Sequence, residues 1–117
     1  MGWDVFYHPS FAQELKALEP QVREGLLGSF VLLETFGPQL GRPAADTLKA
    51  SRHSNMKELR VVISGEPWRV AYAFDPVRRA VILVAGSKAG QSQALFYRRL
   101  IRIADKRFDE HVRSFKK

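Results

Sequence analysis

Three apolar runs follow one another at short intervals in the second half of the chain, and their spacing limits how it can fold. They cover residues 56–63, 68–75 and 80–85. The two connections between them, SGEP and PVRR, are rich in turn-forming residues. Strands that are joined by connections this short run antiparallel. The sequence therefore predicts an antiparallel sheet built on these three strands.

Helical patterns fill most of the remaining chain. Residues 3–7 predict a strand, and residues 9–18 and 20–36 predict two helices with apolar side chains on one stripe. A short strand is expected at Thr47–Ala50, within a loop, and a last helix at residues 92–115. The predicted fold class is α+β, with the order β-α-α-β-β-β-α in a single domain of residues 1–117. We expect an antiparallel sheet with the helices packed mainly on one face, which leaves the other face open.

Composition excludes several kinds of site. The chain has no cysteine, so disulfides, zinc–thiolate centres and cysteine nucleophiles are ruled out. Its histidines, His8, His53 and His111, lack the spacing of metal ligands, and we expect neither a metal nor a cofactor. No apolar run approaches the ~20 residues of a membrane helix, and the N-terminus does not resemble a signal peptide. These features favour a cytoplasmic protein that does not bind membranes.

Basic residues are concentrated after the first two predicted helices. The chain has 19 Lys+Arg and 12 Asp+Glu, but residues 1–36 hold only two of the basic and five of the acidic side chains. Residues 37–117 therefore carry a strong net positive charge, part of it on one side of the last helix and at Lys116 and Lys117. Such a surface is typical of proteins that bind phosphate groups, although an acidic protein partner can also bind it.

Strand periodicity places several charged residues on one side of the predicted sheet. Side chains alternate along a strand, so Glu58 and Arg60 share a side, and Arg69 on the next strand points the same way. Lys88 follows the third strand and can join them. Cations suit RNA cleavage by the internal 2′-hydroxyl, because they stabilise the negative charge that develops on the phosphate. We therefore take Arg69, Arg60, Glu58 and Lys88 as the candidate catalytic residues.

Several roles remain open at this point. Glu58 can act as the general base or can only orient an arginine, and His53 can act as an acid or a base. Glu58 and Arg60 can equally form a cross-strand ion pair on a solvated surface. Around the candidate site we expect RNA contacts from five further residues: Lys57, Arg52, His53, Tyr97 and Arg99.

Four segments carry a resemblance to a known family. They are TLKASRHSNMKELR at residues 47–60, WRVAYAFD at 68–75, AGSK at 85–88 and IADKRFD at 103–109. With these segments the chain resembles the RelE/ParE toxin superfamily, and more closely its HigB-like, phage-derived branch. The resemblance extends over nearly the whole chain, and a RelE-like fold has the order of elements predicted above.

The resemblance implies the toxin of a type II toxin–antitoxin system. Such a toxin is a metal-independent mRNA endoribonuclease that associates with the ribosome, inhibits translation, and forms a hetero-oligomer with a cognate helix-turn-helix antitoxin. By resemblance, Arg69 takes the position of an arginine early in the third strand, and Arg60 that of a second-strand lysine. Lys88 matches the basic residue after the fourth strand. Glu58 stands where RelE has a lysine, and Tyr97 matches a late tyrosine at a different offset.

Two other functions have to be separated from RNA cleavage. A ParE-like toxin of the same fold inhibits DNA gyrase without catalysis, and a basic module can bind nucleic acid without cleaving it. The convergence of Glu58, Arg60 and Arg69 favours cleavage, because a gyrase-binding toxin needs no such cluster. A base-stacking module would need exposed aromatic side chains, whereas those in this sequence fall mostly on the predicted core side.

Overall fold

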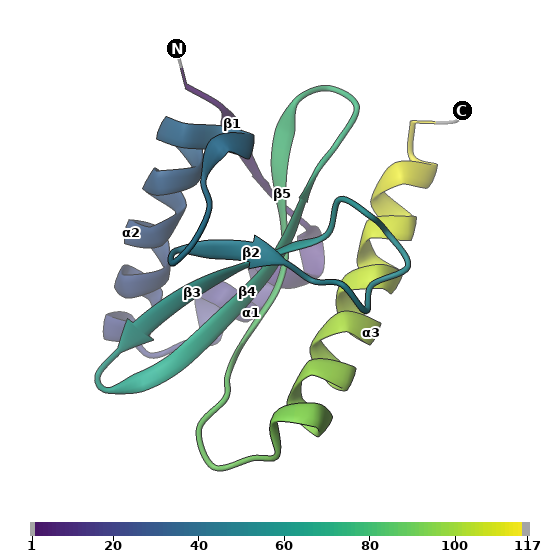
Figure 1. The fold of residues 1–117 in the computed structure, drawn as a ribbon. Helices are drawn as coiled ribbons and strands as arrows, with labels where there is room; N and C mark the ends of the chain where they lie inside the picture. The colour runs from purple at the N-terminus through teal and green to yellow at the C-terminus, as the bar shows by residue number, and fades with distance from the viewer. Residues whose placement is uncertain (1, 116–117) are drawn as a thin grey trace.

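The computed structural model describes residues 2–115 of the chain. Lys116 and Lys117, which extend the predicted basic side of the last helix, lie outside the described residues. The described residues form a five-stranded sheet and three α-helices (Figure 1). The elements are β1 (Asp4–Tyr7), α1 (Pro9–Ala17), α2 (Pro20–Phe36), the 3-10 helix η1 (Gly37–Gln39), β2 (Ala45–Thr47), β3 (Lys57–Ile63), β4 (Glu66–Phe74), β5 (Arg79–Ser87) and α3 (Gln93–Arg113).

This arrangement confirms the predicted α+β class, and the predicted elements follow one another in the expected order, with one further strand, β2, before the last three. The three strands of the predicted meander, β3, β4 and β5, are antiparallel neighbours within the sheet order β1-β5-β4-β3-β2. The short strand expected at Thr47–Ala50 is present but lies slightly earlier, as β2, and pairs with β3.

The sheet as a whole is mixed rather than antiparallel. β1 forms one edge and pairs in parallel with β5, so that Asp4 lies beside Arg79. Val5 and Tyr7 of β1 pack against the core that α1 and α2 also cover. The paired segments are far apart in the sequence, and no turn joins them directly. The direction of this pairing therefore has no local sequence signal, unlike that of a hairpin.

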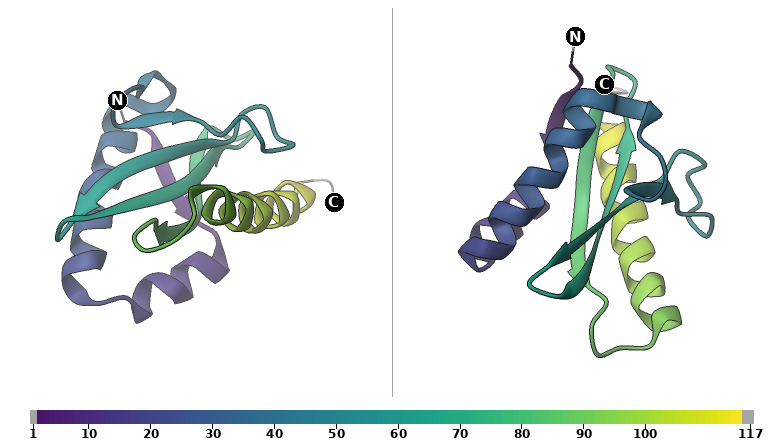
Figure 2. Two further views of the ribbon diagram at one scale, coloured as in Figure 1. Left: turned by 60° about the horizontal axis from the view of Figure 1, so that its bottom comes forward. Right: turned by 60° about the vertical axis from the view of Figure 1, so that its left-hand side comes forward.

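Helices cover both faces of the sheet, whereas the sequence analysis expected one face to be left open. Figure 2 shows the sheet between α2 and α3. On one face Leu26 of α2 packs in a core with Ile82, and on the other Phe96 of α3 packs in a second core with Leu83. Ile82 and Leu83 are neighbours on β5 that point in opposite directions, which explains why β5 is apolar throughout. The apolar stripe of α3 requires a face of its own, and the far side of the sheet provides it.

The loop between β2 and β3, residues 48–56, reaches away from the sheet to α3 (Figure 1). Ser51 donates a hydrogen bond from Oγ to Asp105 Oδ1 (2.5 Å), and His53 Nε2 lies 2.7 Å from Asp109 Oδ1. Arg52 adds a contact between its guanidinium and the Asp109 carboxylate. These bonds hold the loop as a wall beside α3. Within residues 2–115, no helix is long and apolar enough to cross a membrane.

The end of α2 depends on a glycine. Gly37 has a φ of 55°, and a Cβ at this position would lie 2.3 Å from Trp3 Nε1. We expect Gly37→Ala to lower the free energy of unfolding by more than ~1 kcal/mol, because the backbone is strained and Trp3 has to move. Gly28→Ala is the matched control, since a Cβ there meets no atom within 4 Å. It should raise the same free energy by about 0.5–1 kcal/mol. Urea denaturation measures both variants, and a shift in the same direction for both would contradict this explanation.

Candidate active site

The β3–β4 hairpin places two arginines directly opposite each other. Ser64 and Gly65 form its two-residue turn with φ values of 52° and 79°, the backbone conformation that matches the twist of a hairpin. The turn fixes the register, so that Arg60 on β3 pairs with Arg69 on β4. Glu58 follows by alternation on the same face, opposite the small Ala71. The predicted convergence of the two arginines and Glu58 is therefore observed.

Glu58 is the centre of this cluster. The residue is only 3% exposed, and both of its carboxylate oxygens are occupied. Oε1 accepts a hydrogen bond from the Tyr97 hydroxyl (2.8 Å) and lies 3.7 Å from Arg69 Nε. Oε2 accepts hydrogen bonds from Arg60 Nε (3.2 Å) and Nη2 (3.1 Å). The cluster is thus not a cross-strand pair on an open, solvated surface, because the carboxylate is buried beneath its partners.

Tyr97 enters the cluster from α3. Its hydroxyl accepts a hydrogen bond from Arg69 Nε (3.2 Å) while it donates to Glu58, so it joins the helix to both strands. Burial, together with the hydrogen bond to Glu58, raises the pKa of the Tyr97 phenol. At neutral pH this group is therefore a hydrogen-bond donor and not a base.

Lys88 lies immediately after β5, on the helix side of the cluster. Its backbone N–H donates to the Pro67 carbonyl (2.8 Å), which fixes the start of the loop, and its Nζ lies 5.5 Å from the centre of the Tyr97 ring. Burial, followed by the positive charge of Arg69, lowers the pKa of the Lys88 ammonium. Lys88 thus gives up a proton more readily than an ordinary lysine.

The cluster opens into a cleft of about 340 Å³ between β3, the β2–β3 loop and α3. Glu58, Arg60 and Tyr97 line it, and Asp46 on β2 stands at its rim. Asp46 Oδ2 accepts hydrogen bonds from Arg60 Nη2 (3.3 Å) and Arg42 Nε (3.0 Å). Arg60 is therefore held between a buried and a partly exposed carboxylate. We call this hollow the catalytic cleft after the two candidate catalytic residues that line it, Glu58 and Arg60; Arg69 and Lys88 are not among its lining residues. Its cationic side chains (Arg42, Lys49 and Arg60) outnumber its carboxylates (Asp46 and Glu58), which suits a phosphate.

The residues that were predicted to contact RNA lie in different parts of the structure. Tyr97 belongs to the catalytic cleft, whereas Lys57 alternates onto the opposite face of β3 from Glu58. Arg52 and His53 bind Asp109 and hold the β2–β3 loop on α3. Arg99 borders a different hollow, together with Gly86 and Ser87. Contacts of these four outer residues with RNA remain predictions.

Some residues of the site were not found by sequence reasoning. Asp46 has no recognisable pattern, because its strand is only three residues long. Asp105 and Asp109 do carry a signal: they are acidic residues beside the buried Ala104 and Phe108 of α3, and such positions require partners. Among residues 2–115 there is no group of three His, Asp or Glu side chains able to hold a metal ion.

The sequence of the chain is similar to one protein family and to two named proteins. Residues 13–109 match the family described as phage-derived protein Gp49-like. A Mycobacterium tuberculosis (strain ATCC 25618 / H37Rv) protein named "Putative toxin HigB2" is 42% identical over 102 residues, which are 86% of this chain and 50% of that protein. A second protein of the same strain, "Putative toxin HigB3", is 41% identical over 110 residues, 94% of each chain. The chain thus spans half the length of the first relative and nearly all of the second.

The central carboxylate leads to a test of stability. Glu58→Gln keeps the shape of the side chain but removes the charge that Arg60 and Arg69 share. We expect the free energy of unfolding to fall by about 1–3 kcal/mol, because hydrogen bonds to a charged group are lost and the two opposed arginines then repel each other. Glu66→Gln, an exposed residue of the same hairpin, should change this free energy by less than ~0.5 kcal/mol. Urea denaturation of both variants gives the comparison, and equal stabilities would show that Glu58 does not organise the cluster.

Proposed function

The chain belongs to the Gp49-like family of phage-derived proteins, which is of the RelE/HigB toxin type, and we propose that it is a toxin that cleaves mRNA. Two curated relatives are named as HigB toxins, which supports assignment to a type II toxin–antitoxin system. The observation that carries the proposed activity is the pair of arginines, Arg60 and Arg69, on the two oxygens of the Glu58 carboxylate. Arg60 and Tyr97 line a cleft next to this pair, and Lys88 Nζ lies 5.5 Å from the centre of the Tyr97 ring.

The proposed reaction is attack of an RNA 2′-oxygen on the adjacent phosphorus. The new P–O2′ bond forms as the P–O5′ bond breaks, which yields a 2′,3′-cyclic phosphate and a 5′-hydroxyl. Negative charge accumulates on the non-bridging phosphate oxygens, and the Arg60 and Arg69 guanidiniums stabilise it. The 2′-hydroxyl proton passes to solvent water, and the departing 5′-oxygen receives a proton from the Lys88 ammonium.

In this proposal Glu58 orients the arginines and is not the general base. Both of its oxygens already accept hydrogen bonds from Tyr97 and Arg60, and the residue is almost fully buried. A substrate hydroxyl reaches it only if one of those partners moves. Tyr97 has a related positioning role, because its hydroxyl contacts both Glu58 and the Nε of Arg69. His53 is engaged with Asp109 and is assigned no proton transfer.

The family also supports proposals for the partners. A toxin of this type is neutralised by a cognate antitoxin, for which the resemblance implies a helix-turn-helix protein in a hetero-oligomer. Its substrate would be mRNA on the ribosome, in the cytoplasm, so that cleavage inhibits translation. A ParE-like toxin that inhibits gyrase without catalysis is the alternative that the same fold allows.

Primer extension on mRNA from cells that express the protein tests the proposed activity. New 5′ ends within translated codons support RNA cleavage, whereas loss of DNA supercoiling with intact mRNA would support the gyrase-inhibiting alternative. We expect Arg69→Ala or Arg60→Ala to relieve toxicity and to lower the cleavage rate by about 10²-fold or more, because each removes a cation from the transition state. Lys16→Ala, an exposed residue of α1, is the control and should remain toxic. Full toxicity after both arginines are replaced would refute the site.

The lowered pKa of Lys88 leads to a second prediction. A general acid works only in its protonated form, so the cleavage rate should fall as the pH rises through a pKa that lies below the usual 10.5. Lys88→Arg keeps a positive charge but holds its proton, and should lower the rate by about 10²-fold and remove this alkaline decline. Initial rates on a short RNA, corrected for alkaline hydrolysis without protein, give both profiles. A wild-type rate that still rises at pH 10.5 would exclude Lys88 as the acid.

A further inference from the structure

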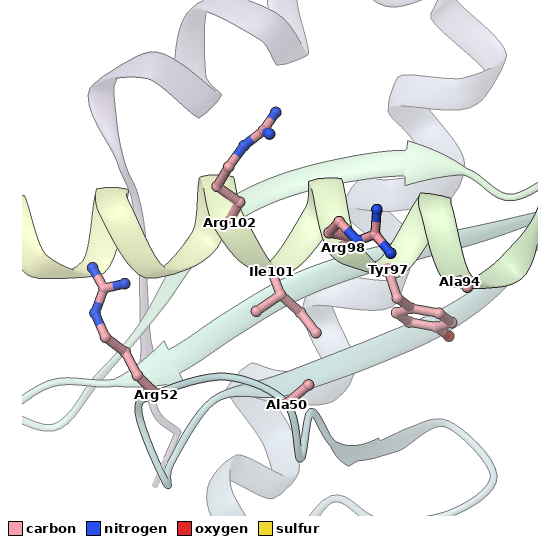
Figure 3. Close-up of a pocket in the computed structure, with 7 residues that line it drawn as sticks. All are labelled: Ala50, Arg52, Ala94, Tyr97, Arg98, Ile101 and Arg102. Atoms are coloured by element: carbon pink, nitrogen blue, oxygen red, sulfur yellow. The ribbon is translucent and has the colours of Figure 1, made fainter.

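A second hollow adjoins the catalytic cleft along α3 and has a volume of about 550 Å³ (Figure 3). We call it the side groove. The residues that line it are Ala50, Arg52, Ala94, Tyr97, Arg98, Ile101 and Arg102. Ala50, Tyr97 and Ile101 line the catalytic cleft as well, so the two hollows adjoin each other along these three residues. An RNA chain whose phosphate lies beside Arg60 in the catalytic cleft can therefore extend into the side groove.

The floor of the side groove is apolar and is bordered by small side chains. Figure 3 shows Ile101 extending from α3 towards the loop that carries Ala50, with Tyr97 one turn along the helix. Ile101 and Tyr97 are partly buried against the core beneath α3, so their positions are fixed. Ala50 and Ala94 leave room between the loop and the helix. An apolar floor that is fixed in place and bordered by small side chains suits a flat ring such as a nucleobase.

The rim of the side groove is positively charged. Arg98 and Arg102 lie one turn apart on the exposed side of α3, and neither has an ion-pair partner among the described residues. Arg52 stands on the loop side, where Asp109 holds its guanidinium. Among residues 2–115, no carboxylate lines the groove. An apolar floor under unpaired guanidiniums matches a nucleotide, which combines a flat ring with a phosphate.

We propose that the side groove binds the nucleotide that flanks the scissile phosphate. Its base packs on Ile101 and Tyr97, and its phosphate is bound by Arg98, since Figure 3 shows the Arg102 guanidinium directed away from the loop that carries Ala50. This inference rests on the proposed function in one respect: the scissile phosphate has to lie in the catalytic cleft. Asp105 and Asp109 act as positioning residues, because they hold the β2–β3 loop that forms the opposite wall. The groove would thereby contribute to the choice of cleavage site.

The test measures RNA binding separately from cleavage. The probe is a fluorescent tetranucleotide with a 2′-deoxy residue at the cleavage position, titrated by fluorescence anisotropy at fixed moderate salt. Arg98→Ala should raise the Kd about tenfold through loss of a phosphate contact, and Ala50→Phe should raise it similarly by filling the groove. Arg113→Ala is the matched control, because it removes an exposed arginine from the far end of the same helix. Thermal unfolding confirms that each variant is folded.

Probes that lack one base show whether the side groove binds that base. In the wild type, removal of the base on one side of the deoxy residue should weaken binding about as much as Ala50→Phe does. In Ala50→Phe, the same abasic probe should bind no more weakly than the intact probe, because the base has already lost its site. An abasic effect of the same size in both proteins would overturn the inference.

The outcomes separate this inference from the proposed function. If the wild type cleaves RNA but Arg98→Ala and Ala50→Phe bind the probe as Arg113→Ala does, the groove inference is wrong and the proposed activity stands. If the wild type cleaves no RNA but binding depends on Arg98 and on the base, the groove stands and the activity does not. If only binding of the antitoxin is weakened by the groove variants, the groove is a protein interface and the inference is overturned.

Discussion

The buried carboxylate of Glu58 is the interaction on which the rest of the site depends. Arg60 and Arg69 face each other across neighbouring strands, where like charges normally destabilise a sheet. Glu58 lies beside both and accepts hydrogen bonds from Arg60 and from Tyr97, so its own burial is compensated. The result is a pair of guanidiniums that is held in place before any anion arrives. Such preorganisation is what electrostatic stabilisation of a transition state requires.

The position of α3 links this cluster to the core of the protein. One side of the helix packs against the sheet through Phe96 and Leu100. Tyr97 lies on the same helix, between these two residues in the sequence. Its hydroxyl forms hydrogen bonds with Glu58 and Arg69, so the packing of α3 also fixes the positions of these two side chains. The same helix then presents Arg98 to solvent along the side groove. A single amphipathic helix thus supplies core packing, orientation of the proposed catalytic arginines and a cationic rim.

Much of the site could be predicted from local rules, and the limits of these rules are physical. Arg60 and Arg69 could be placed together because side chains alternate along strands and a short turn fixes the register. The face occupied by α3 could not be predicted, since its apolar stripe shows that it is buried but not against which side of the sheet. Likewise, the parallel pairing of β1 depends on residues distant in the sequence. The sequence analysis predicted that Arg52 and His53 contact RNA, whereas in the structure both side chains bind Asp109 of α3. The sequence of a polar loop does not reveal such a contact with a distant helix.

The residues that form the cleft are far apart in the sequence, and this affects when the cleft can assemble during synthesis of the protein. β3 and β4 emerge from the ribosome early enough to form a hairpin, but Tyr97 lies on the last helix and β1 has to wait for β5. A nascent polypeptide that ends before residue 93 therefore exposes the sheet face that α3 later covers and leaves Glu58 without its phenol partner. Arg69 and Glu58 acquire their final arrangement only after Tyr97 of α3 has been synthesised. The cleft is thus assembled only after α3 has been synthesised and has packed on the sheet.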